Sequence, residues 1–327
     1  MAKTIRWGII GLGNIAQKFA QDLALVEDGE LVAIASRSMS KALNFNKEFH
    51  VMNVFDSYEE LFECATVDVV YIATPHTEHM NWAILAMQNG KHVLCEKPMG
   101  VNGKQLSQML ETAKKQKVFL MEALWSRFNP TIRKIKEIVD EGGLGALEYI
   151  HADFAFYALD RAQEGRLLNP NLAGGSLLDI GIYPVFLTYL LLGVPDKITA
   201  RSSFHETGAE IQTSMMFDYK NAHAVLYSGL TSNSRMQATV SGTKGAVFID
   251  PRWHETEGYT ILNDTEEEHI SLPKLGKGYT YEINEVHECI RNNKLESELW
   301  SHANSMELIE ILDAIRKQLG ISFPFEA

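Results

Sequence analysis

A glycine-containing segment near the start of the chain is the first candidate for chemistry. The pattern Gly11-x-Gly13-x-x-Ala16 follows the apolar run 5–10 and opens a segment with apolar residues at helical spacing. Gly11 permits a tight turn, Gly13 lets a pyrophosphate approach the backbone, and the small Ala16 lets the helix pack closely on the strand. The amide groups at the start of that helix would then face the phosphates. The expected dinucleotide contacts in this segment are Gly11, Gly13, Asn14, Ile15 and Ala16.

The residues after the second apolar run, 31–35, bear on which dinucleotide binds. Sites that select NAD usually carry Asp or Glu about 20 residues after the glycines, where the carboxylate bonds the ribose 2′-hydroxyl. This chain has Ser36-Arg37-Ser38 at that point and no carboxylate. Arg37 could pair with a 2′-phosphate to which both serine hydroxyls donate, and the alternative is a solvent-exposed arginine in a loop. We therefore expect NADP as the cofactor, with NAD as the second choice.

Two further segments contain side chains that suit proton transfer to or from an alcohol oxygen. One is 95–98, with the sequence CEKP, and the other is 174–183, with the sequence GGSLLDIGIY. A free tyrosine, with a pKa of about 10, is a poor base at neutral pH, and a nearby ammonium such as that of Lys97 would lower its pKa. Lys97 could also stabilise a developing alkoxide. Asp179 and Tyr183 are four residues apart and would share one face of a helix.

Structural roles compete with these chemical ones. Lys97 alone could be a surface lysine at a strand end, Asp179 a carboxylate that favours a helix start, and Tyr183 a core side chain. Pro184 adds a constraint, because proline is tolerated in the first turn of a helix and disfavoured in its interior. A shared face therefore requires a helix that is already formed at Asp179.

Four segments together resemble the glucose–fructose oxidoreductase/inositol dehydrogenase (Gfo/Idh/MocA) family. They are the glycine loop 11–16, the segment YIATP at 71–75, and the CEKP and GGSLLDIGIY segments. The resemblance extends over nearly the whole chain. The segments 122–128 (EALWSRF) and 166–170 (RLLNP) are more narrowly similar to the branch of dimeric dihydrodiol dehydrogenases and NADP-linked xylose dehydrogenases.

The resemblance implies roles for individual residues. Lys97 corresponds to the active-site lysine of the family, and Asp179 corresponds to the aspartate of its helix motif. Tyr183 stands where much of the family has the histidine that transfers the proton, and this branch has tyrosine there. Either Lys97 or Tyr183 is then the formal acid or base. Pro98 corresponds to a proline that commonly follows a cis peptide bond in the family.

The resemblance also places the loop after the apolar run 67–73 beside the nicotinamide. Trp125 and Arg127 follow the last strand of the first domain and could form a wall of the substrate cleft, which Phe154 could border. Core packing is the alternative role for Trp125. The expected cofactor contacts beyond the glycine loop are Ser36, Arg37, Ser38, Thr74, Pro75, His76, Glu96 and Lys97.

Alternating strand and helix patterns must position these side chains in the first third of the chain. The strand-like runs are continuously apolar, as expected for parallel strands covered on both faces, and helical patterns separate them. This predicts an α/β dinucleotide-binding Rossmann domain, with a doubly wound parallel sheet, in residues 1–122. The expected strands are 5–10, 31–35, 67–73, 92–96 and 118–122, and the expected helices begin at 15 and span 41–49, 58–64, 77–89 and 103–116.

Beyond Glu122 the pattern changes to strand-like runs joined mostly by turns. Turn sequences such as 218–221 and 242–245 indicate an open, mostly antiparallel sheet. This predicts an α+β domain in residues 123–327 that binds the substrate and mediates oligomerisation. An uncovered sheet face favours a homo-oligomer, most simply a dimer. The expected strands are 149–157, 198–204, 211–217, 222–228, 237–241 and 246–249, and the expected helices are 133–141, 177–192, 281–292 and 302–319.

Composition and spacing argue against several other classes of protein. The chain has 30 basic and 42 acidic residues, and its net charge of −12 argues against a nucleic-acid or anionic-membrane partner. Its three cysteines form no CxxC pair, so neither a cysteine zinc site nor a disulfide framework is expected. His76 and His79 are better explained as part of the cofactor loop than as metal ligands, so no metal is expected. The cysteine usage, together with the lack of a signal peptide or a membrane-length apolar run, favours a cytoplasmic protein.

These features predict an NAD(P)-dependent oxidoreductase. It would move a hydride between nicotinamide and a hydroxyl or carbonyl carbon of a small polyhydroxylated substrate, such as an aldose, polyol or cyclic diol. Nicotinamide and substrate are expected to meet between the carboxyl edge of the parallel sheet and the second domain, where Lys97, Asp179 and Tyr183 would converge. The alternative is a non-catalytic dinucleotide-binding sensor or regulatory protein, which would not need the proton-transfer residues.

Overall fold

The computed structural model describes residues 3–263 and 266–326, and these divide into two compact units. Unit 1 comprises Met1–Phe128 and Leu275–Met306, and unit 2 comprises Asn129–Lys274 and Glu307–Ala327. The first division therefore falls six residues after the expected boundary at Glu122. The return of the chain to unit 1 was not expected from the sequence.

A buried hydrogen-bond chain explains why the late segment belongs to unit 1. Helix α8 (Thr280–Arg291) carries His287, whose Nε2 accepts a hydrogen bond of 2.9 Å from the indole nitrogen of Trp7 in the first strand. The Nδ1 atom of His287 lies 2.9 Å from Asp28, which also pairs with Arg291. One imidazole tautomer satisfies both contacts, because Nε2 accepts while Nδ1 donates. Such pairing over nearly 300 residues leaves no local pattern in the sequence.

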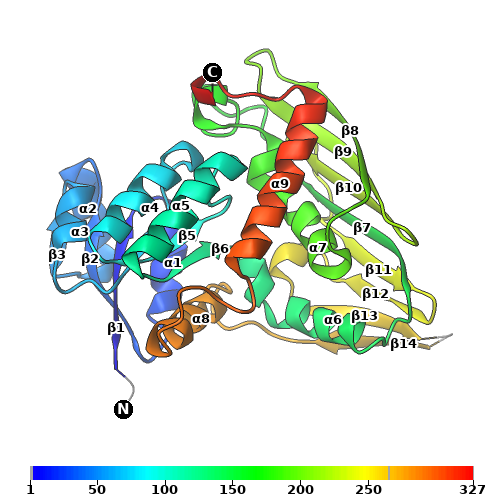
Figure 1. Cartoon of the computed structure of the whole chain (residues 1–327), viewed down its shortest axis with the longest axis horizontal. Helices are drawn as coiled ribbons and strands as arrows, with labels where there is room; N and C mark the ends of the chain where they lie inside the picture. The colour runs from blue at the N-terminus through cyan, green and yellow to red at the C-terminus, as the bar shows by residue number, and fades with distance from the viewer. Residues whose placement is uncertain (1–2, 264–265, 327) are drawn as a thin grey trace. The chain divides into compact units, whose positions relative to one another are not determined.

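Unit 1 is built on a parallel sheet with the strand order β3-β2-β1-β4-β5-β6 within the described residues (Figure 1). Each adjacent pair is parallel, so the predicted doubly wound sheet is confirmed. The order reverses between β1 and β4, and ligands of such sheets bind at the carboxyl ends of the strands beside this point. The strands are β1 (Ile5–Ile10), β2 (Gly29–Ala35), β3 (Asn53–Phe55), β4 (Val69–Ile72), β5 (His92–Glu96) and β6 (Leu120–Ala123).

Helices alternate with these strands, and side-chain caps mark where several of them begin. Ser38, Ser57 and Asn102 accept hydrogen bonds from backbone amides in the first turns of the helices that follow them. The expected helix 77–89 begins instead with a single turn, His76–Glu78, and continues as α4. The helices are α1 (Asn14–Leu23), α2 (Met39–Phe49), α3 (Tyr58–Glu63), α4 (His79–Gln88) and α5 (Gly103–Gln116).

Unit 2 contains a second sheet, with the order β14-β13-β12-β11-β7-β10-β9-β8 among the described residues (Figure 1). Its neighbours are antiparallel except β7 and β10, which pair in parallel, so the predicted mostly antiparallel sheet is confirmed. The strands are β7 (Leu147–Ala155), β8 (Lys197–Phe204), β9 (Glu210–Asp218), β10 (His223–Gly229), β11 (Ala238–Gly242), β12 (Gly245–Ile249), β13 (Gly258–Asn263) and β14 (Glu266–Ser271).

One face of this second sheet is covered by an apolar helix. Helix α7 (Ile182–Leu192) follows the π-helical turn Leu177–Gly181 and packs on β7 and β10. Every residue from Ile182 to Tyr189 is buried, which fits a helix that is apolar on all sides. The expected single helix over 177–192 is therefore two segments of different helical type. The remaining helices are α6 (Pro130–Asp140) and α9 (His302–Leu319), and the last division between the units falls within α9.

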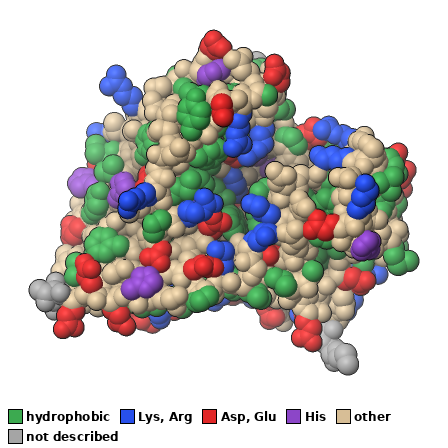
Figure 2. All heavy atoms as spheres, turned by 180° about the vertical axis from the view of Figure 1, so that it is seen from behind, with side chains coloured by type: hydrophobic (Ala, Val, Ile, Leu, Met, Phe, Trp, Pro, Cys, Tyr) green, Lys and Arg blue, Asp and Glu red, His purple; other side chains and the backbone are tan. Residues whose placement is uncertain are grey.

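Charged side chains of both signs share the surface of the protein. Figure 2 shows lysine and arginine side chains interspersed with acidic ones on the visible face. The net charge of −12 is therefore not spread as an even negative field. None of the helices in the described ranges is both long enough and apolar enough to cross a membrane.

Candidate functional site

The glycine loop between β1 and α1 has the geometry of an anion site. Gly11 has a φ of +79°, and a Cβ there would lie 2.5 Å from the carbonyl carbon of Ala73, so only glycine fits. A Cβ on Gly13 would meet only the Gly11 oxygen, at 3.9 Å, so the space in front of that backbone is open. Gly13 is also the N-cap of α1, and no side chain caps the helix. The first amides of α1 are thus open to a phosphate, and the residues present fit a dinucleotide.

The Ser36-Arg37-Ser38 segment follows β2 as expected, with one partner that the sequence did not suggest. The Arg37 guanidinium donates to Glu78 at 3.1 Å, and its side chain is 65% exposed. Such an exposed ion pair is weak and leaves most of the Arg37 donors available to another anion. Ser38 caps α2, and its hydroxyl lies 2.9 Å from that of Ser40. Glu78, at the start of α4, is a residue of this site that sequence reasoning missed.

The loop after β4 is tied to the loop after β5 by a buried histidine. His79 lies 2.9 Å from the carbonyl oxygen of Thr74 through Nε2 and 2.9 Å from that of Pro98 through Nδ1. Burial lowers the pKa of His79, and the two carbonyl contacts oppose that change. Because both ring nitrogens are occupied by backbone carbonyls, His79 is a structural tie and not a metal ligand. In the same loop the buried Thr74 hydroxyl has no partner among the described residues, and it remains available to a bound cofactor.

The segment around Lys97 is held by two carboxylates. Glu96 accepts hydrogen bonds from the hydroxyl of Tyr71 and, at 3.3 Å, from the backbone amide of Lys97. The bond between Lys97 and Pro98 is cis, as the family resemblance implied. Past it, the backbone amide of Met99 donates at 2.9 Å to Glu122. The backbone of this segment is therefore set by contacts that do not involve the Lys97 side chain.

Glu122 links the Lys97 segment to the late part of unit 1. Its second carboxylate oxygen accepts hydrogen bonds from the Trp300 indole at 3.2 Å and from the Ser305 hydroxyl at 2.8 Å. Burial raises the pKa of Glu122, and these donors oppose the rise. No sequence pattern suggested this role, because Trp300 and Ser305 lie about 180 residues away from Glu122.

Glu282, on α8, is a buried carboxyl with an unusual environment. It is fully buried, and neither carboxyl oxygen has a hydrogen-bond partner within the described part of the chain. Burial raises the pKa of Glu282 well above its usual range, and the negative charges of Glu96 and Asp22 raise it further. The neutral acid is therefore the form that the fold favours.

This environment makes the stability of the protein depend on pH. Because the folded-state pKa of Glu282 is raised, its contribution to stability is complete below pH about 4.3 and is lost as the pH rises toward the folded-state pKa. The variant Glu282→Gln cannot ionise. The free energy of unfolding of Glu282→Gln minus that of the wild type is expected to increase by about 1.4 kcal/mol for each unit that the pH rises between about 4.3 and the folded-state pKa of Glu282. Denaturant unfolding at pH 5 and pH 7 measures this growth. The exposed Glu288→Gln variant is the control, and an equal difference at both pH values for Glu282→Gln would contradict the assignment.

The second group of predicted catalytic residues lies in unit 2. Asp179 is buried in the π-helical turn, and its carboxylate accepts a 2.6 Å hydrogen bond from the guanidinium of Arg166. Tyr183 lies in the first turn of α7, directly after the π-helical turn, so Pro184 lies inside a continuous helix at the junction of its π-helical and α-helical segments. The expected α-helical face shared by Asp179 and Tyr183 is modified, because the π-turn changes the angular spacing between them. Arg166 belongs to the RLLNP segment, but the sequence did not show that it pairs with Asp179.

Aromatic rings surround Tyr183. The ring centroid of Phe154 lies 5.5 Å from that of Tyr183, and the centroid of His254 lies 5.4 Å from it. Phe154 and His254 stack on each other at 4.1 Å. Phe154 was an expected substrate residue, whereas His254 was missed, since it lies about 70 residues after Tyr183 on a short turn without a recognisable motif. All three side chains are buried and form one aromatic cluster that includes the phenol of Tyr183.

The remaining expected substrate residues, Trp125 and Arg127, lie in unit 1. Trp125 stacks on Tyr279 with ring centroids 4.8 Å apart. Arg127 is buried, and its Nε donates to the carbonyl of Leu299 at 2.8 Å. Both side chains therefore have contacts within unit 1, and Trp125 is only half-buried.

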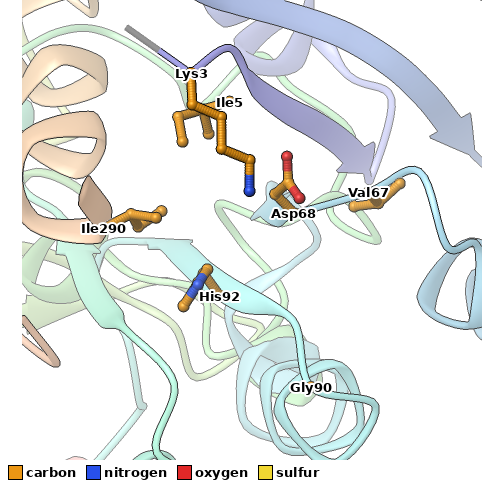
Figure 3. A pocket seen from close by; sticks show the side chains of 7 residues that line it. All are labelled: Lys3, Ile5, Val67, Asp68, Gly90, His92 and Ile290. Atoms are coloured by element: carbon orange, nitrogen blue, oxygen red, sulfur yellow. The ribbon is translucent and has the colours of Figure 1, made fainter. Parts of the chain in front are cut away.

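A small cavity in unit 1 lies away from these residues. It is found at the amino ends of the parallel strands, where the side chain of Lys3 points toward Asp68 (Figure 3). Asp68 already pairs with Arg6 at 2.7 Å. Dinucleotides bind at the opposite, carboxyl ends of such strands, so this cavity is not the cofactor site. The cavity is lined by Lys3, Ile5, Val67, Asp68, Gly90, His92 and Ile290.

The parallel sheet, the open glycine loop and the second antiparallel sheet together define a two-domain dinucleotide-dependent oxidoreductase. Residues 5–124 match the oxidoreductase family with an NAD-binding Rossmann fold, and residues 132–248 match the GFO/IDH/MocA C-terminal domain. The chain belongs to the Gfo/Idh/MocA oxidoreductase family. The predicted fold class and the predicted NAD(P)-dependent oxidoreductase class are thus confirmed.

Named relatives cover the whole chain. It is 38% identical over 333 residues to the trans-1,2-dihydrobenzene-1,2-diol dehydrogenase of Mus musculus, with 98% of each protein covered. The human protein of the same name is 35% identical over 340 residues, again with 98% of each covered. Among solved structures, an aldose-aldose oxidoreductase from Caulobacter crescentus, complexed with glycerol, superposes with a TM-score of 0.87 at 25% identity, covering 96% of this chain and 97% of that one.

Proposed function

We propose that this protein is an NADP-preferring dehydrogenase that oxidises one hydroxyl of a cyclic vicinal diol or of an aldose. The observation that carries the proposal is the aromatic cluster of Phe154, Tyr183 and His254. Phe154 and His254 are aromatic neighbours of Tyr183, and aromatic faces suit the ring of a cyclic substrate. The names of the relatives, a dihydrobenzene diol dehydrogenase and an aldose oxidoreductase, support the same two substrate classes.

The proposed chemistry divides the removal of two hydrogens between cofactor and protein. NADP, when bound, supplies the acceptor for the hydride that leaves the carbinol carbon. The hydroxyl proton is taken by Tyr183 or by Lys97, whichever is the formal base, and passes on to water. Where Tyr183 is the base, the positive charge of Lys97 stabilises the negative charge that develops on the substrate oxygen.

Asp179 is proposed to orient the substrate. Its carboxylate is held by Arg166 at 2.6 Å, and an ionised carboxylate can accept further hydrogen bonds from a neighbouring substrate hydroxyl. Such a contact would distinguish a vicinal diol from a simple alcohol, because only the diol offers a second donor. The Arg166 side chain is 55% exposed, so the ion pair can adjust when the substrate binds.

A substrate panel tests this proposal. Purified protein is incubated with NADP and with trans-dihydrobenzene diol, trans-cyclohexanediol, D-xylose, D-glucose and cyclohexanol, and the reduced cofactor is followed by absorbance. Turnover of diols or aldoses that exceeds turnover of cyclohexanol is the expected result. NADP binding without turnover of any compound would instead favour the dinucleotide sensor.

The preference for NADP is proposed to depend on Arg37. Loss of a charge-assisted contact to the 2′-phosphate is expected to raise the dissociation constant for NADP by about 10- to 100-fold in Arg37→Ala. The dissociation constant for NAD should change by less than about twofold, because NAD lacks that phosphate. Calorimetric titration with both cofactors measures the two values. Lys47→Ala, which removes an exposed basic residue of the helix α2 that follows Arg37, is the control. Equal losses for NAD and NADP in Arg37→Ala would refute the role.

We infer that the protein forms a homodimer through the outer face of the unit 2 sheet. Apolar side chains from four of its strands lie on this face, each between 39% and 44% exposed, and Val225 pairs directly with Met216 across neighbouring strands. An apolar patch on a continuous sheet is typical of an interface. The four side chains are Tyr149, Met216, Val225 and Phe248.

Light scattering checks the dimer. The wild type is expected to show twice the chain mass of 36.8 kDa, whereas Val225→Glu should be monomeric at the same concentration because it places a charge in the buried interface. Met52→Glu is the control, since Met52 is also exposed but lies in unit 1. A monomeric wild type, or a dimeric Val225→Glu, would contradict this inference.

We also propose a cytoplasmic location. The three cysteines, Cys64, Cys95 and Cys289, are free thiols, as is usual in a reducing compartment. Detection of the protein in the cytosolic fraction of its native cells would support this location, and detection in a secreted fraction would contradict it.

A further inference from the structure

A buried carboxylate in unit 2 lies directly behind the predicted catalytic segment. Glu210, in β9, is 2% exposed, and its backbone pairs with that of Gly175. One carboxylate oxygen accepts hydrogen bonds from the hydroxyls of Ser176, at 2.6 Å, and Thr213, at 2.7 Å. The other accepts a 2.8 Å hydrogen bond from the backbone amide of Leu177. The carboxylate thus satisfies donors at the very start of the π-helical turn.

The hydroxyls around Glu210 all direct their protons toward it. Ser202 lies 2.6 Å from Thr213, and Ser228 lies 2.9 Å from Ser176. Each hydroxyl has a single proton, and Thr213 and Ser176 use theirs on Glu210, so Ser202 and Ser228 must be the outer donors. Burial raises the pKa of Glu210, and these hydrogen bonds oppose the rise. The direction of the donors fits an ionised carboxylate at the centre of the network.

The network supports the residues that the proposed reaction uses. Leu177 begins the π-helical turn that carries Asp179, and Tyr183 follows in the next turn of the same continuous helix. A Cβ on Gly181 would lie 2.9 Å from the Ser228 hydroxyl, so the backbone of the π-helical turn packs closely against the hydroxyls around Glu210. The turn has no side-chain cap from its own N-cap residue, so the acceptor for the Leu177 amide comes from the sheet.

We propose that Glu210 is a positioning residue for Asp179 and Tyr183. It fixes the backbone at Leu177 and thereby the direction in which the π-helical turn presents both side chains. This inference rests on the proposed dehydrogenase function, because only that function assigns work to Asp179 and Tyr183. If Glu210 only stabilised unit 2, its replacement would lower the melting temperature of the protein without a specific effect on kcat.

The test uses Glu210→Gln, which keeps the shape of the side chain but has one acceptor oxygen in place of two. Its amide group must face either the Leu177 amide or the two hydroxyls, and donors then oppose donors. We expect kcat to fall by about 10- to 100-fold, because a small displacement of a reacting group has an effect of that size. The dissociation constant for NADP should stay within about twofold, since the glycine loop belongs to unit 1. Hydrogen exchange of the amides of residues 177–183 should become faster.

Two further variants keep the test decisive. Thr188→Val removes another buried hydrogen bond of α7, the 3.0 Å bond to the Pro184 carbonyl, and should lower the melting temperature while kcat and exchange at 177–183 stay unchanged. Ser176→Ala leaves the Glu210 carboxylate facing the Leu177 amide, so its kcat should fall less than that of Glu210→Gln. It replaces Glu210→Gln as the test variant if Glu210→Gln does not fold. The proposal would be overturned if Glu210→Gln left kcat and hydrogen exchange unchanged. It would also be overturned if every variant, including Thr188→Val, lost kcat in proportion to the fall in its melting temperature.

Failure of the proposed function would be recognised separately. If the wild type turns over no compound, the dehydrogenase assignment fails and the exchange measurement alone decides the role of Glu210. Faster exchange at 177–183 in Glu210→Gln but not in Thr188→Val would still support positioning. Equal exchange in both variants would overturn it.

Discussion

Replacing Lys97 with methionine is expected to lower kcat by about 10²- to 10⁴-fold, whereas the affinity for NADP should fall much less than kcat. Methionine fills a similar volume but has no charge, so it can neither stabilise a negative oxygen nor exchange a proton. The surrounding backbone should not move, because the amides of Lys97 and Met99 donate to Glu96 and Glu122 independently of the Lys97 side chain. Steady-state kinetics with a diol and calorimetric titration with NADP measure the two quantities.

A second lysine, next to the opposite end of β5, supplies a matched control. The Lys91 ammonium is buried at the amino end of β5 and donates to the carbonyls of Cys64, at 2.7 Å, and Val67, at 3.0 Å. Lys91→Met should therefore lower the melting temperature and leave kcat nearly unchanged. Equal turnover by Lys97→Met and wild type would exclude the proposed role of Lys97, and a loss of NADP binding parallel to the loss of turnover would make it a cofactor contact only.

The second large effect is expected for Tyr183→Phe. Removal of the phenolic oxygen should lower kcat by about 10²- to 10⁴-fold if Tyr183 is the proton-transfer group, with a small change in the KM for the substrate. The contacts of the ring with Phe154 and His254 do not require the hydroxyl, so the aromatic cluster should persist. The measurement is the pH dependence of kcat for wild type, Tyr183→Phe and Lys97→Met. The limb of the profile that reports the base should disappear only in the variant that lacks it, which distinguishes the two candidates.

Tyr189→Phe is the control for this substitution. Tyr189 lies on the same helix, and its hydroxyl donates to Glu307 at 2.6 Å, so its loss should affect stability without affecting kcat. If Tyr183→Phe retained the activity and pH profile of the wild type, Tyr183 would be a packing residue of the aromatic cluster and not a proton-transfer group.

Much of the fold was predictable because its strongest patterns are local. Continuous apolar runs such as 69–72, between helices of ordinary length, are typical of buried parallel strands, and the order β3-β2-β1-β4-β5-β6 follows the expected doubly wound form. Strands β3, β13 and β14 were missed. β3 has only three residues, and β14 is an exposed edge strand rich in glutamate that lacks a buried face. The attachment of α8 to unit 1 depends on the contact between Trp7 and His287, which no local pattern records.

In the predicted site, too, the residues of short motifs were found from the sequence, whereas residues that act on distant partners were not. Gly11, Lys97 and Tyr183 belong to short motifs, so their chemistry could be inferred from neighbouring residues. Glu78 and Glu210 were missed, since each acts on a partner that lies about 30 to 40 residues away in the sequence. Long-range carboxylates of this kind are found only when the fold brings them to the motif.

Isotope transfer tests the central proposal most directly. A diol or aldose that turns over in the panel is prepared with deuterium on the carbinol carbon and incubated with NADP and the wild-type protein, and the reduced cofactor is analysed by mass spectrometry. The expected result is one deuterium in each reduced cofactor molecule, with the matching ketone or lactone as the oxidised product. Reduced cofactor without deuterium, or NADP that binds yet is not reduced by any compound of the panel, would contradict the proposed dehydrogenase.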